Sequence, residues 1–170
     1  KSRPRRVSHE LQFNIAQLLK EVTGATRSYD VDVENIGQFD EEVRVVSPIV
    51  GQVDFLYTGS NILVTGLLKT TIQKNCGRCL ASFTTPVSIE LEEEFYPSVD
   101  ILTGAIQPKQ PDVDETNYID ELHILDLAEV VRQEIFLESD GFLYCRLDCK
   151  GICPHCGQDR NLNPCTCQDD

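Results

Sequence analysis

The sequence predicts an α+β protein: an antiparallel β-sheet or a partly open barrel, with flanking helices and a cysteine-rich C-terminal tail. Three observations favour this class. Residues 43–95 alternate β-branched and aromatic side chains with polar ones, which is typical of half-buried strands. Only two segments show helical spacing of apolar residues. Residues 145–170 hold six of the eight cysteines but too few large apolar residues to build a core.

Both helices are expected at the ends of the β-rich region. The first is predicted over residues 14–22, where apolar residues recur at helical spacing and Asn14 is an acceptable N-cap. The second is predicted over residues 126–138. There Asp126 would be the N-cap, and Glu129 would complete a capping box in which each side chain satisfies a free backbone N–H.

Four segments have the patterning of strands: residues 28–34, 43–57, 62–74 and 83–95. Pro48 and Gly51 interrupt the second of them, which indicates a bulge or a break. Residues 59–61 read as a hairpin turn. Pro86 has no N–H to donate, so the last strand should lie at an edge of the sheet or pair only beyond this residue.

The remaining chain divides into linking segments and the tail. Residues 96–117 carry three prolines and several acids, and we expect a mobile acidic loop there. A short strand is expected over residues 118–124. We therefore divide the chain into a β-rich core domain, residues 1–144, and a cysteine-rich tail, residues 145–170, packed on that core.

Composition excludes several classes of protein. The chain has 170 residues and a formal net charge of −13, from 28 acidic and 15 basic residues. A protein this acidic is a poor non-specific binder of nucleic acid, because such binding depends on Lys and Arg neutralising phosphates. No apolar run reaches the roughly 20 residues of a membrane-spanning helix. The basic residues 1–6 are not followed by the apolar core of a signal peptide, so we expect a cytoplasmic protein that does not enter membranes.

The eight cysteines predict two metal sites. A structural Zn²⁺ site takes four thiolates in a tetrahedron, and eight cysteines supply two such sets with none left over. Two Cys-x2-Cys knuckles are present, Cys76/Cys79 in the turn between two predicted strands and Cys153/Cys156 in the tail. A disulfide framework is the alternative for an even number of cysteines, and an iron centre or a redox dithiol is a further one.

Two groupings of the cysteines are open, although one is preferred. The preferred grouping joins Cys76, Cys79, Cys145 and Cys149 in one site and Cys153, Cys156, Cys165 and Cys167 in the other, because the second site then closes locally with little loss of loop entropy. The rival grouping joins the two Cys-x2-Cys knuckles, as in a zinc ribbon. Either way a site with four thiolates has no open position for water, so we expect two structural Zn²⁺ ions.

No active site is recognisable in the sequence. It has no Gly-rich phosphate loop, no nucleophile elbow and no His–carboxylate set at a known spacing. We therefore expect a protein that is not an enzyme and has no small-molecule substrate. Six basic residues near the knuckles are candidates for contacts to RNA: Lys69, Lys74, Arg78, Arg146, Lys150 and Arg160.

The combined pattern from about residue 40 onward resembles a known family. It consists of Cys76-Gly-Arg-Cys79-Leu80, Glu94-Phe95, Ile119-Asp120, Leu127, Glu134-Ile135, Cys145-x3-Cys149-Lys-Gly151-Ile-Cys153-Pro-x-Cys156-Gly157, and Asn161-Leu162-Asn163-x-Cys165-x-Cys167. This pattern is similar to that of the YceD-type large-ribosomal-RNA accumulation proteins of bacteria and chloroplasts. Asp159 and Arg160 stand where the family has a tighter spacing before Asn161, and no cysteine is affected.

The resemblance implies a role in the synthesis, processing or stability of large-subunit (23S) ribosomal RNA in the bacterial cytoplasm, and it supplies no catalytic residue. Together with the acidity, it favours a ribosome biogenesis factor that reaches RNA indirectly, through a basic large-subunit ribosomal protein or a pre-ribosomal particle. Two alternatives remain: a zinc protein that binds RNA directly through the basic residues near the knuckles, and a redox or iron-binding protein.

Overall fold

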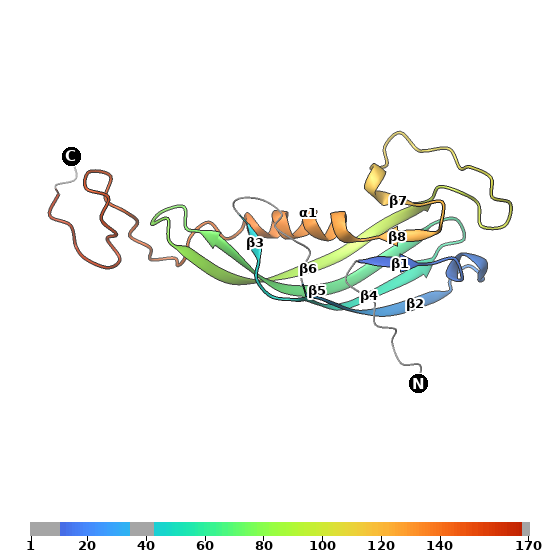
Figure 1. Ribbon diagram of the computed structural model, residues 1–170, viewed down its shortest axis with the longest axis horizontal. Helices are drawn as coiled ribbons and strands as arrows, with labels where there is room; N and C mark the ends of the chain where they lie inside the picture. Colours follow the sequence, from blue (N-terminus) through green and yellow to red (C-terminus); the bar gives the residue numbers. More distant parts are fainter. Residues whose placement is uncertain (1–10, 35–42, 168–170) are drawn as a thin grey trace.

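The computed structural model describes residues 11–34 and 43–167 (Figure 1). The elements in chain order are β1 (Gln12–Asn14), the 3-10 helix η1 (Leu18–Lys20), β2 (Thr26–Val33), β3 (Arg44–Val45), β4 (Ile49–Tyr57), β5 (Ile62–Asn75), β6 (Ser82–Pro97), the 3-10 helix η2 (Glu115–Asn117), β7 (Tyr118–Ile119), β8 (Ile124–Asp126) and the α-helix α1 (Ala128–Ser139). The molecule is elongated, with the cysteine-rich tail at one end of the sheet and the β4–β5 turn towards the other (Figure 1).

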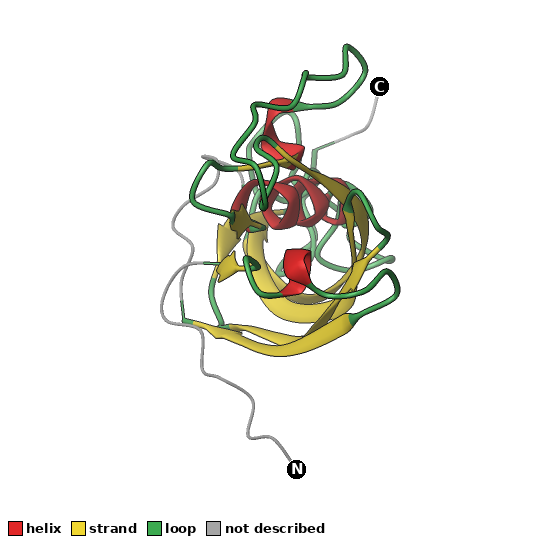
Figure 2. Ribbon diagram, turned by 90° about the vertical axis from the view of Figure 1, so that its right-hand side faces the viewer, coloured by secondary structure: helices red, strands yellow, loops and turns green. Residues whose placement is uncertain are grey.

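The main sheet is open and mostly antiparallel. Its strand order is β2-β4-β5-β6-β7, β3 pairs with β5, and β1 and β8 form a separate antiparallel pair. Only the short β6–β7 pairing is parallel. The sheet curves around α1 without closing on itself (Figure 2). The α+β class with an antiparallel sheet is therefore confirmed in outline, whereas the partly open barrel is wrong, and the described residues contain one α-helix rather than several.

The core lies on the concave side of the curved sheet. Phe55 from β4 and Phe95 from β6 are fully buried, as are the apolar residues of α1 that face the sheet. Phe13 brings the β1–β8 pair onto this core: its ring centroid lies 4.9 Å from that of Phe55 and 5.0 Å from that of Tyr29. Alternation along β4, β5 and β6 thus buries one face of each long strand, as the sequence pattern predicts.

The predicted helix over residues 14–22 is wrong. Residues 12–14 pair with β8 instead, and only the single turn η1 is helical. Asn14 belongs to β1 and does not cap a helix: its Oδ1 accepts the N–H of Ala16 at 3.1 Å, but the N-cap position of η1 is Gln17, which makes no side-chain cap hydrogen bond. A nine-residue helix is marginal by itself. Here Leu18 and Leu19 are buried by one helical turn, while Val22 is 81% exposed, so a longer helix has no further apolar face to bury.

The second predicted helix is confirmed, but its predicted start is wrong. Asp126 belongs to β8, and α1 begins at Ala128. The Asp126 Oδ1 still accepts the N–H of Ala128 at 2.8 Å. Glu129 does not complete a capping box, because its carboxylate receives hydrogen bonds from the Arg132 guanidinium on the next turn, at 2.9 and 2.5 Å. This ion pair holds the pKa of Glu129 below its usual value, chiefly through the hydrogen bond from Arg132.

The predicted break at Pro48 and the predicted hairpin turn are present, whereas the break or bulge predicted at Gly51 is wrong, because β4 runs through Gly51 in continuous register with β2 and β5. The chain is interrupted between β3 and β4 at Pro48, and the β4–β5 hairpin turns at residues 58–61. Gly51 lies at a close approach of these two strands: with φ +156°, a Cβ there would meet the Leu67 carbonyl oxygen at 2.1 Å. Pro86 does lie on an edge, because β6 pairs beside it only with β5, where it faces Thr71. Pairing nevertheless begins before Pro86, at Ser82.

The segment between β6 and β7 has little regular structure. An isolated bridge joins Val99 to Ile106, and η2 precedes β7. The strand predicted over residues 118–124 is split into β7 and the start of β8. Within the described residues, no helix is long and apolar enough to cross a membrane. The division at residue 144 into a core and a tail stays a prediction.

Candidate metal centres

The first cysteine tetrad joins the β5–β6 turn to the chain that follows α1. Cys76 and Cys79 lie in that turn, which is closed by a hydrogen bond from the Leu80 N–H to the Cys76 carbonyl at 2.9 Å. The Sγ atom of Cys76 lies 3.8 Å from that of Cys149, and the Sγ atom of Cys79 lies 3.7 Å from that of Cys145. All four sulfurs lie within 4.8 Å of one another, and three of the four residues are buried.

The second tetrad closes within the tail. Cys153 and Cys156 form a knuckle in which the Gly157 N–H donates to the Cys153 carbonyl at 2.8 Å. Cys165 and Cys167 supply the other two thiols, again within 4.8 Å of one another. Cys156 is exposed and the Cys165–Cys167 pair is half-buried, so this site is wetter than the first.

The two knuckles have the same backbone. Leu80 occupies the position that Gly157 takes in the second knuckle, and both residues have left-handed φ angles, +61° and +72°. Glycine adopts this conformation without steric cost, whereas leucine does not. Because Leu80 is also 63% exposed, no burial of its side chain offsets that cost. The left-handed conformation of Leu80 is compensated by the hydrogen bond from its N–H to the Cys76 carbonyl, which closes the knuckle.

The sulfur geometry fits a tetrahedral metal ion. A Zn–S bond of about 2.3 Å places the sulfurs of a regular tetrahedron about 3.8 Å apart. The distances of 3.7 and 3.8 Å in the first tetrad match this edge. A disulfide needs about 2.05 Å, and all eight cysteines are free thiols. The structure therefore contains two tetrads that could bind metal ions. Four thiolates in a tetrahedron suit zinc and iron alike, so the geometry leaves the metal open.

The thiols cannot all ionise without a cation. In the first tetrad burial raises the pKa of Cys76, but the N–H groups of Cys79, Cys145 and Arg78 outweigh it and lower the pKa to about 6. Burial, followed by the neighbouring thiols, raises the pKa of Cys145 to about 12. One thiolate is thus stable, and further negative charges at this spacing repel each other. A bound dication removes that repulsion, which is the charge balance expected of a thiolate metal site.

The second tetrad likewise contains one thiol with a lowered pKa and one with a strongly raised pKa. The pKa of Cys153 falls to about 5, chiefly because the Cys156 N–H donates to its sulfur, with burial opposing and the His155 N–H assisting. The pKa of Cys167 rises to about 12, mainly through its hydrogen bond with Cys165 and then with Cys156. Each tetrad therefore holds one thiol whose pKa is lowered and two whose pKa is raised, and a bound cation would favour ionisation of the latter two.

Arg78 links the first knuckle to the tail. Its guanidinium lies 3.9 Å from the centroid of the Tyr144 ring and donates to the Cys149 carbonyl at 3.3 Å. Its backbone N–H points at the Cys76 sulfur, and its carbonyl accepts the N–H of Ile152 at 3.1 Å. The sequence offered Arg78 as a contact to RNA; in the structure its side chain is engaged within the protein.

Asn161, which the sequence shows only as part of a motif, has a structural role beside the first tetrad. Its Oδ1 accepts the Lys150 N–H at 2.8 Å and a guanidinium N–H of Arg146 at 2.9 Å. Its Nδ2 lies 3.5 Å from the Cys149 sulfur. Asn161 thus connects the loop between the two tetrads to a sulfur of the first. In the sequence, the structural role of Asn161 is indicated by its place in the Asn-Leu-Asn motif before Cys165.

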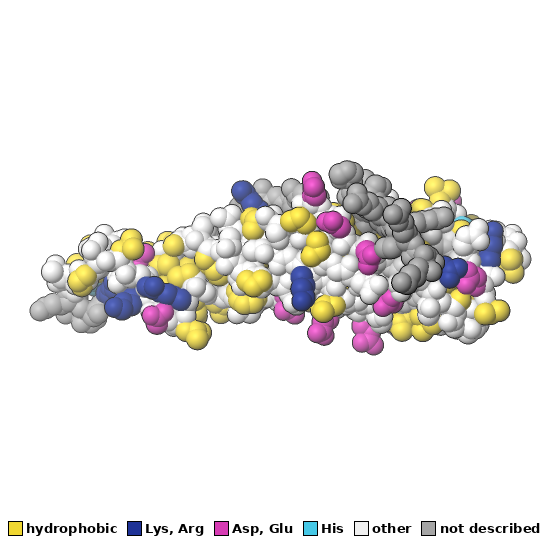
Figure 3. Space-filling model, turned by 90° about the horizontal axis from the view of Figure 1, so that it is seen from below, with side chains coloured by type: hydrophobic (Ala, Val, Ile, Leu, Met, Phe, Trp, Pro, Cys, Tyr) yellow, Lys and Arg dark blue, Asp and Glu magenta, His cyan; other side chains and the backbone are white. Residues whose placement is uncertain are grey.

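The six basic residues do not form one patch. Arg78, Arg146, Lys150 and Arg160 gather around the tail, since the Arg160 N–H donates to the Gly151 carbonyl and Arg146 shares Asn161 with Lys150. Lys74 donates to the carbonyl of Ser139 at the end of α1. Lys69 lies on β5 opposite Ser88, well away from the tail. In the space-filling view, basic side chains are visible at the tail end, in the middle and at the opposite end, whereas most of the visible acidic ones lie along the sheet (Figure 3).

The fold and the sites together define an open β-sheet protein whose C-terminal tail carries two tetracysteine knuckle sites, one of them anchored to the sheet. The family model described as "Large ribosomal RNA subunit accumulation protein YceD" matches residues 64–170, and the chain belongs to this family. The match covers most of β5, and the whole of β6, α1 and the set of eight cysteines. The description of this family refers to accumulation of the large-subunit ribosomal RNA.

The similar proteins found among curated sequences carry no functional name. Uncharacterized proteins of Mycobacterium bovis and of two strains of Mycobacterium tuberculosis are 33% identical to the chain over 97 residues, which is 56% of this chain and 44% of theirs. The matched region is thus less than half the length of these relatives. No solved structure matches the chain.

Proposed function

We propose that this protein is a non-enzymatic ribosome biogenesis factor that supports the synthesis, processing or stability of 23S ribosomal RNA in the bacterial cytoplasm. The observation that carries this proposal is membership of the YceD family, over a region that includes every cysteine. Both tetrads supply four protein ligands, which fills the coordination of a structural Zn²⁺ ion and leaves no position for a substrate. Two zinc ions would then shape the tail rather than perform chemistry.

The charge supports an indirect route to RNA. The chain carries −13 overall, and exposed acids such as Glu90 and Glu92 line the outer face of β6. Such a surface repels phosphates and attracts lysine- and arginine-rich proteins. The favoured partner is therefore a basic ribosomal protein of the large subunit, either free or on an assembly intermediate, with ribosomal RNA reached through it.

Pull-down experiments at increasing salt test this route. The tagged protein is expected to retain basic large-subunit ribosomal proteins at low salt and to lose them as salt screens the charges. Naked 23S RNA should not be retained. Removal of the gene should lower the ratio of 23S to 16S RNA in the cell. Tight binding of naked RNA, with no ribosomal protein retained, would show that the proposed route is wrong.

Direct RNA binding is the second candidate, and the gathering of Arg146, Lys150 and Arg160 on the tail supports it. Lys150→Glu should then reduce crosslinking to ribosomal RNA several-fold, because it replaces an exposed attraction for phosphate with a repulsion. Lys69→Glu is the matched control, since Lys69 is equally exposed but lies on β5. Equal crosslinking by the two variants would exclude the tail as the RNA contact.

A further inference from the structure

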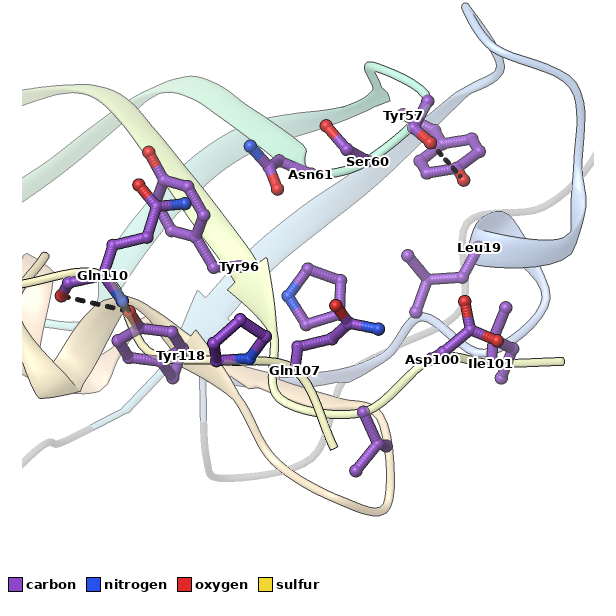
Figure 4. A pocket seen from close by; sticks show the side chains of 14 residues that line it. Leu19, Tyr57, Ser60, Asn61, Tyr96, Asp100, Ile101, Gln107, Gln110 and Tyr118 are labelled. Carbon is purple, nitrogen blue, oxygen red and sulfur yellow. Dashed lines mark hydrogen bonds between the residues drawn. The ribbon is translucent and has the colours of Figure 1, made fainter. Parts of the chain in front are cut away.

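A cavity of about 460 Å³ lies between the β4–β5 turn, the end of β6 and the segment that follows it. Three tyrosines contribute to its wall: Tyr57 from β4, Tyr96 from β6 and Tyr118 from β7. Asp100 and Gln107 line it from the segment after β6 (Figure 4). Its volume suits a single side chain or a small ligand. Neither cysteine tetrad contributes to this cavity, which the proposed function leaves unused.

The tyrosine hydroxyls are already used within the protein. That of Tyr57 donates to the Gly59 carbonyl at 2.8 Å, and that of Tyr96 donates to a carboxylate oxygen of Glu94 at 2.9 Å. The Tyr118 hydroxyl accepts the N–H of Gln110 at 2.7 Å. These bonds hold the rings in place before any ligand arrives. What the tyrosines offer an incoming group is therefore the electron-rich face of each ring.

The charge of the cavity favours a cation. Among the described residues that line it, Asp100 is the one that carries a charge. The Asp100 Oδ1 accepts the N–H groups of Leu102 and Thr103 and the Thr103 hydroxyl, which lower the pKa of this carboxyl and keep it ionised. All these hydrogen bonds from described residues fall on Oδ1, so Oδ2 remains available to a ligand. Glu94 adds a second carboxylate next to the cavity, because it accepts hydrogen bonds from two lining residues, Tyr96 and Asn61.

One tyrosine of the cavity already faces a cation of the chain itself. The Lys109 ammonium lies 5.3 Å from the centroid of the Tyr118 ring, within the range of a cation–π contact. Lys109 is not among the lining residues and is paired with Glu115, so it leaves the interior of the cavity to a ligand. The contact shows that the ring of Tyr118 is accessible to a positive group from outside the cavity wall.

We propose that this cavity receives an arginine side chain from a basic protein partner. Tyrosine faces would stack on the planar guanidinium, and the free oxygen of Asp100 would accept one of its N–H groups. A lysine ammonium cannot stack as a plane and is more strongly hydrated, so arginine is preferred. An RNA base could also stack on tyrosine, but its phosphates would meet the Asp100 and Glu94 carboxylates. The inference rests on the proposed function in that the partner is a basic ribosomal protein.

Tyrosine fluorescence gives a direct assay, because the chain has no tryptophan and five tyrosines, three of them in this cavity. Hexa-arginine and hexa-lysine serve as probes, since neither peptide fluoresces. Hexa-arginine should bind more tightly than hexa-lysine and change the fluorescence at saturation. A single-stranded RNA 12-mer of uridine is the third probe and should not bind.

Two variants and one control locate the site. Asp100→Asn keeps the acceptor for the turn but removes the charge, and should weaken hexa-arginine binding about tenfold, as expected for the loss of a charge-assisted hydrogen bond. Tyr96→Leu should weaken it about threefold and reduce the preference for arginine over lysine. Asp30→Asn, an equal change of charge on the exposed side of β2, should bind hexa-arginine as the unchanged protein does.

Two outcomes would overturn the inference. If the two peptides bind equally and Asp100→Asn behaves like Asp30→Asn, only the overall charge attracts them. If the RNA 12-mer binds and Tyr96→Leu abolishes that binding, the cavity belongs to RNA. Neither result contradicts the proposed function, provided that the pull-down still retains large-subunit ribosomal proteins. Failure of that pull-down with intact arginine preference would instead count against the proposed function alone.

Discussion

Cys149→Ser is expected to lower the metal content of the purified protein from two ions per chain to one. Cys149 is buried and its sulfur lies 3.8 Å from that of Cys76, so its loss breaks the tetrahedron that joins the β5–β6 turn to the tail. The apparent binding free energy of structural zinc is about 10–16 kcal/mol, which makes this the largest effect of any single substitution considered. Elemental analysis of the protein, purified with a reductant, measures it.

Double variants then separate the two groupings of cysteines. In the geometry of the structure, Cys76→Ser with Cys149→Ser should still leave one ion, because both residues belong to the same tetrad. Cys76→Ser with Cys153→Ser should leave none. If the two Cys-x2-Cys knuckles shared a site, the second pair of substitutions would instead leave one ion. A wild-type protein that binds no metal, or that forms disulfides under reducing conditions, would contradict both groupings.

The two sites should differ in their effect on stability. Cys76 and Cys149 are buried between the sheet and the tail, whereas Cys156 is exposed in a site that closes within the tail. Cys156→Ser is therefore the matched control for Cys149→Ser: it also removes one ion, but it should lower the melting temperature of the sheet less. Equal melting temperatures for the two variants would show that the first tetrad does not support the sheet.

The cysteines could be grouped from the sequence because their chemistry restricts them. Thiolate sites need four ligands, and eight cysteines at knuckle spacings have few ways to satisfy that number. The long strands could be predicted for a similar reason. Apolar and polar side chains alternate with a period of two along β4, β5 and β6, as they do in a strand that buries one of its two faces. In both cases a local pattern carries the information.

Other features depend on contacts between distant segments. The apolar residues near Leu18 fit a helix and a single helical turn equally well, and pairing of Phe13 with Leu125 decides between them. Arg78 is exposed, but its guanidinium also contacts Tyr144 and the Cys149 carbonyl, which come from a distant part of the chain. The tyrosine cavity is lined by residues from three strands and from the segment between β6 and β7, and no spacing in the sequence predicts that these residues meet.

Removal of metal from the wild-type protein should unfold the tail while the sheet persists. Between Cys145 and Cys167, few side chains apart from the ligands are buried, and two of the leucines there are 98% and 78% exposed. So little apolar burial cannot offset the entropy of ordering this many residues. Amide hydrogen exchange with and without a chelator, in the presence of a reductant, measures the change: amides of residues 153–167 should lose nearly all protection.

The amides of β4 and β5 are the internal control, because Phe55, Ile62 and Leu68 are fully buried in a core that contains no cysteine. Acid should act like the chelator, since protonation of the thiolates releases the metal. Unchanged exchange in the tail after metal removal would mean that contacts such as those of Arg78 and Asn161 hold it unaided. Those contacts all converge on the first tetrad, so the second tetrad should lose its structure first as the chelator concentration is raised.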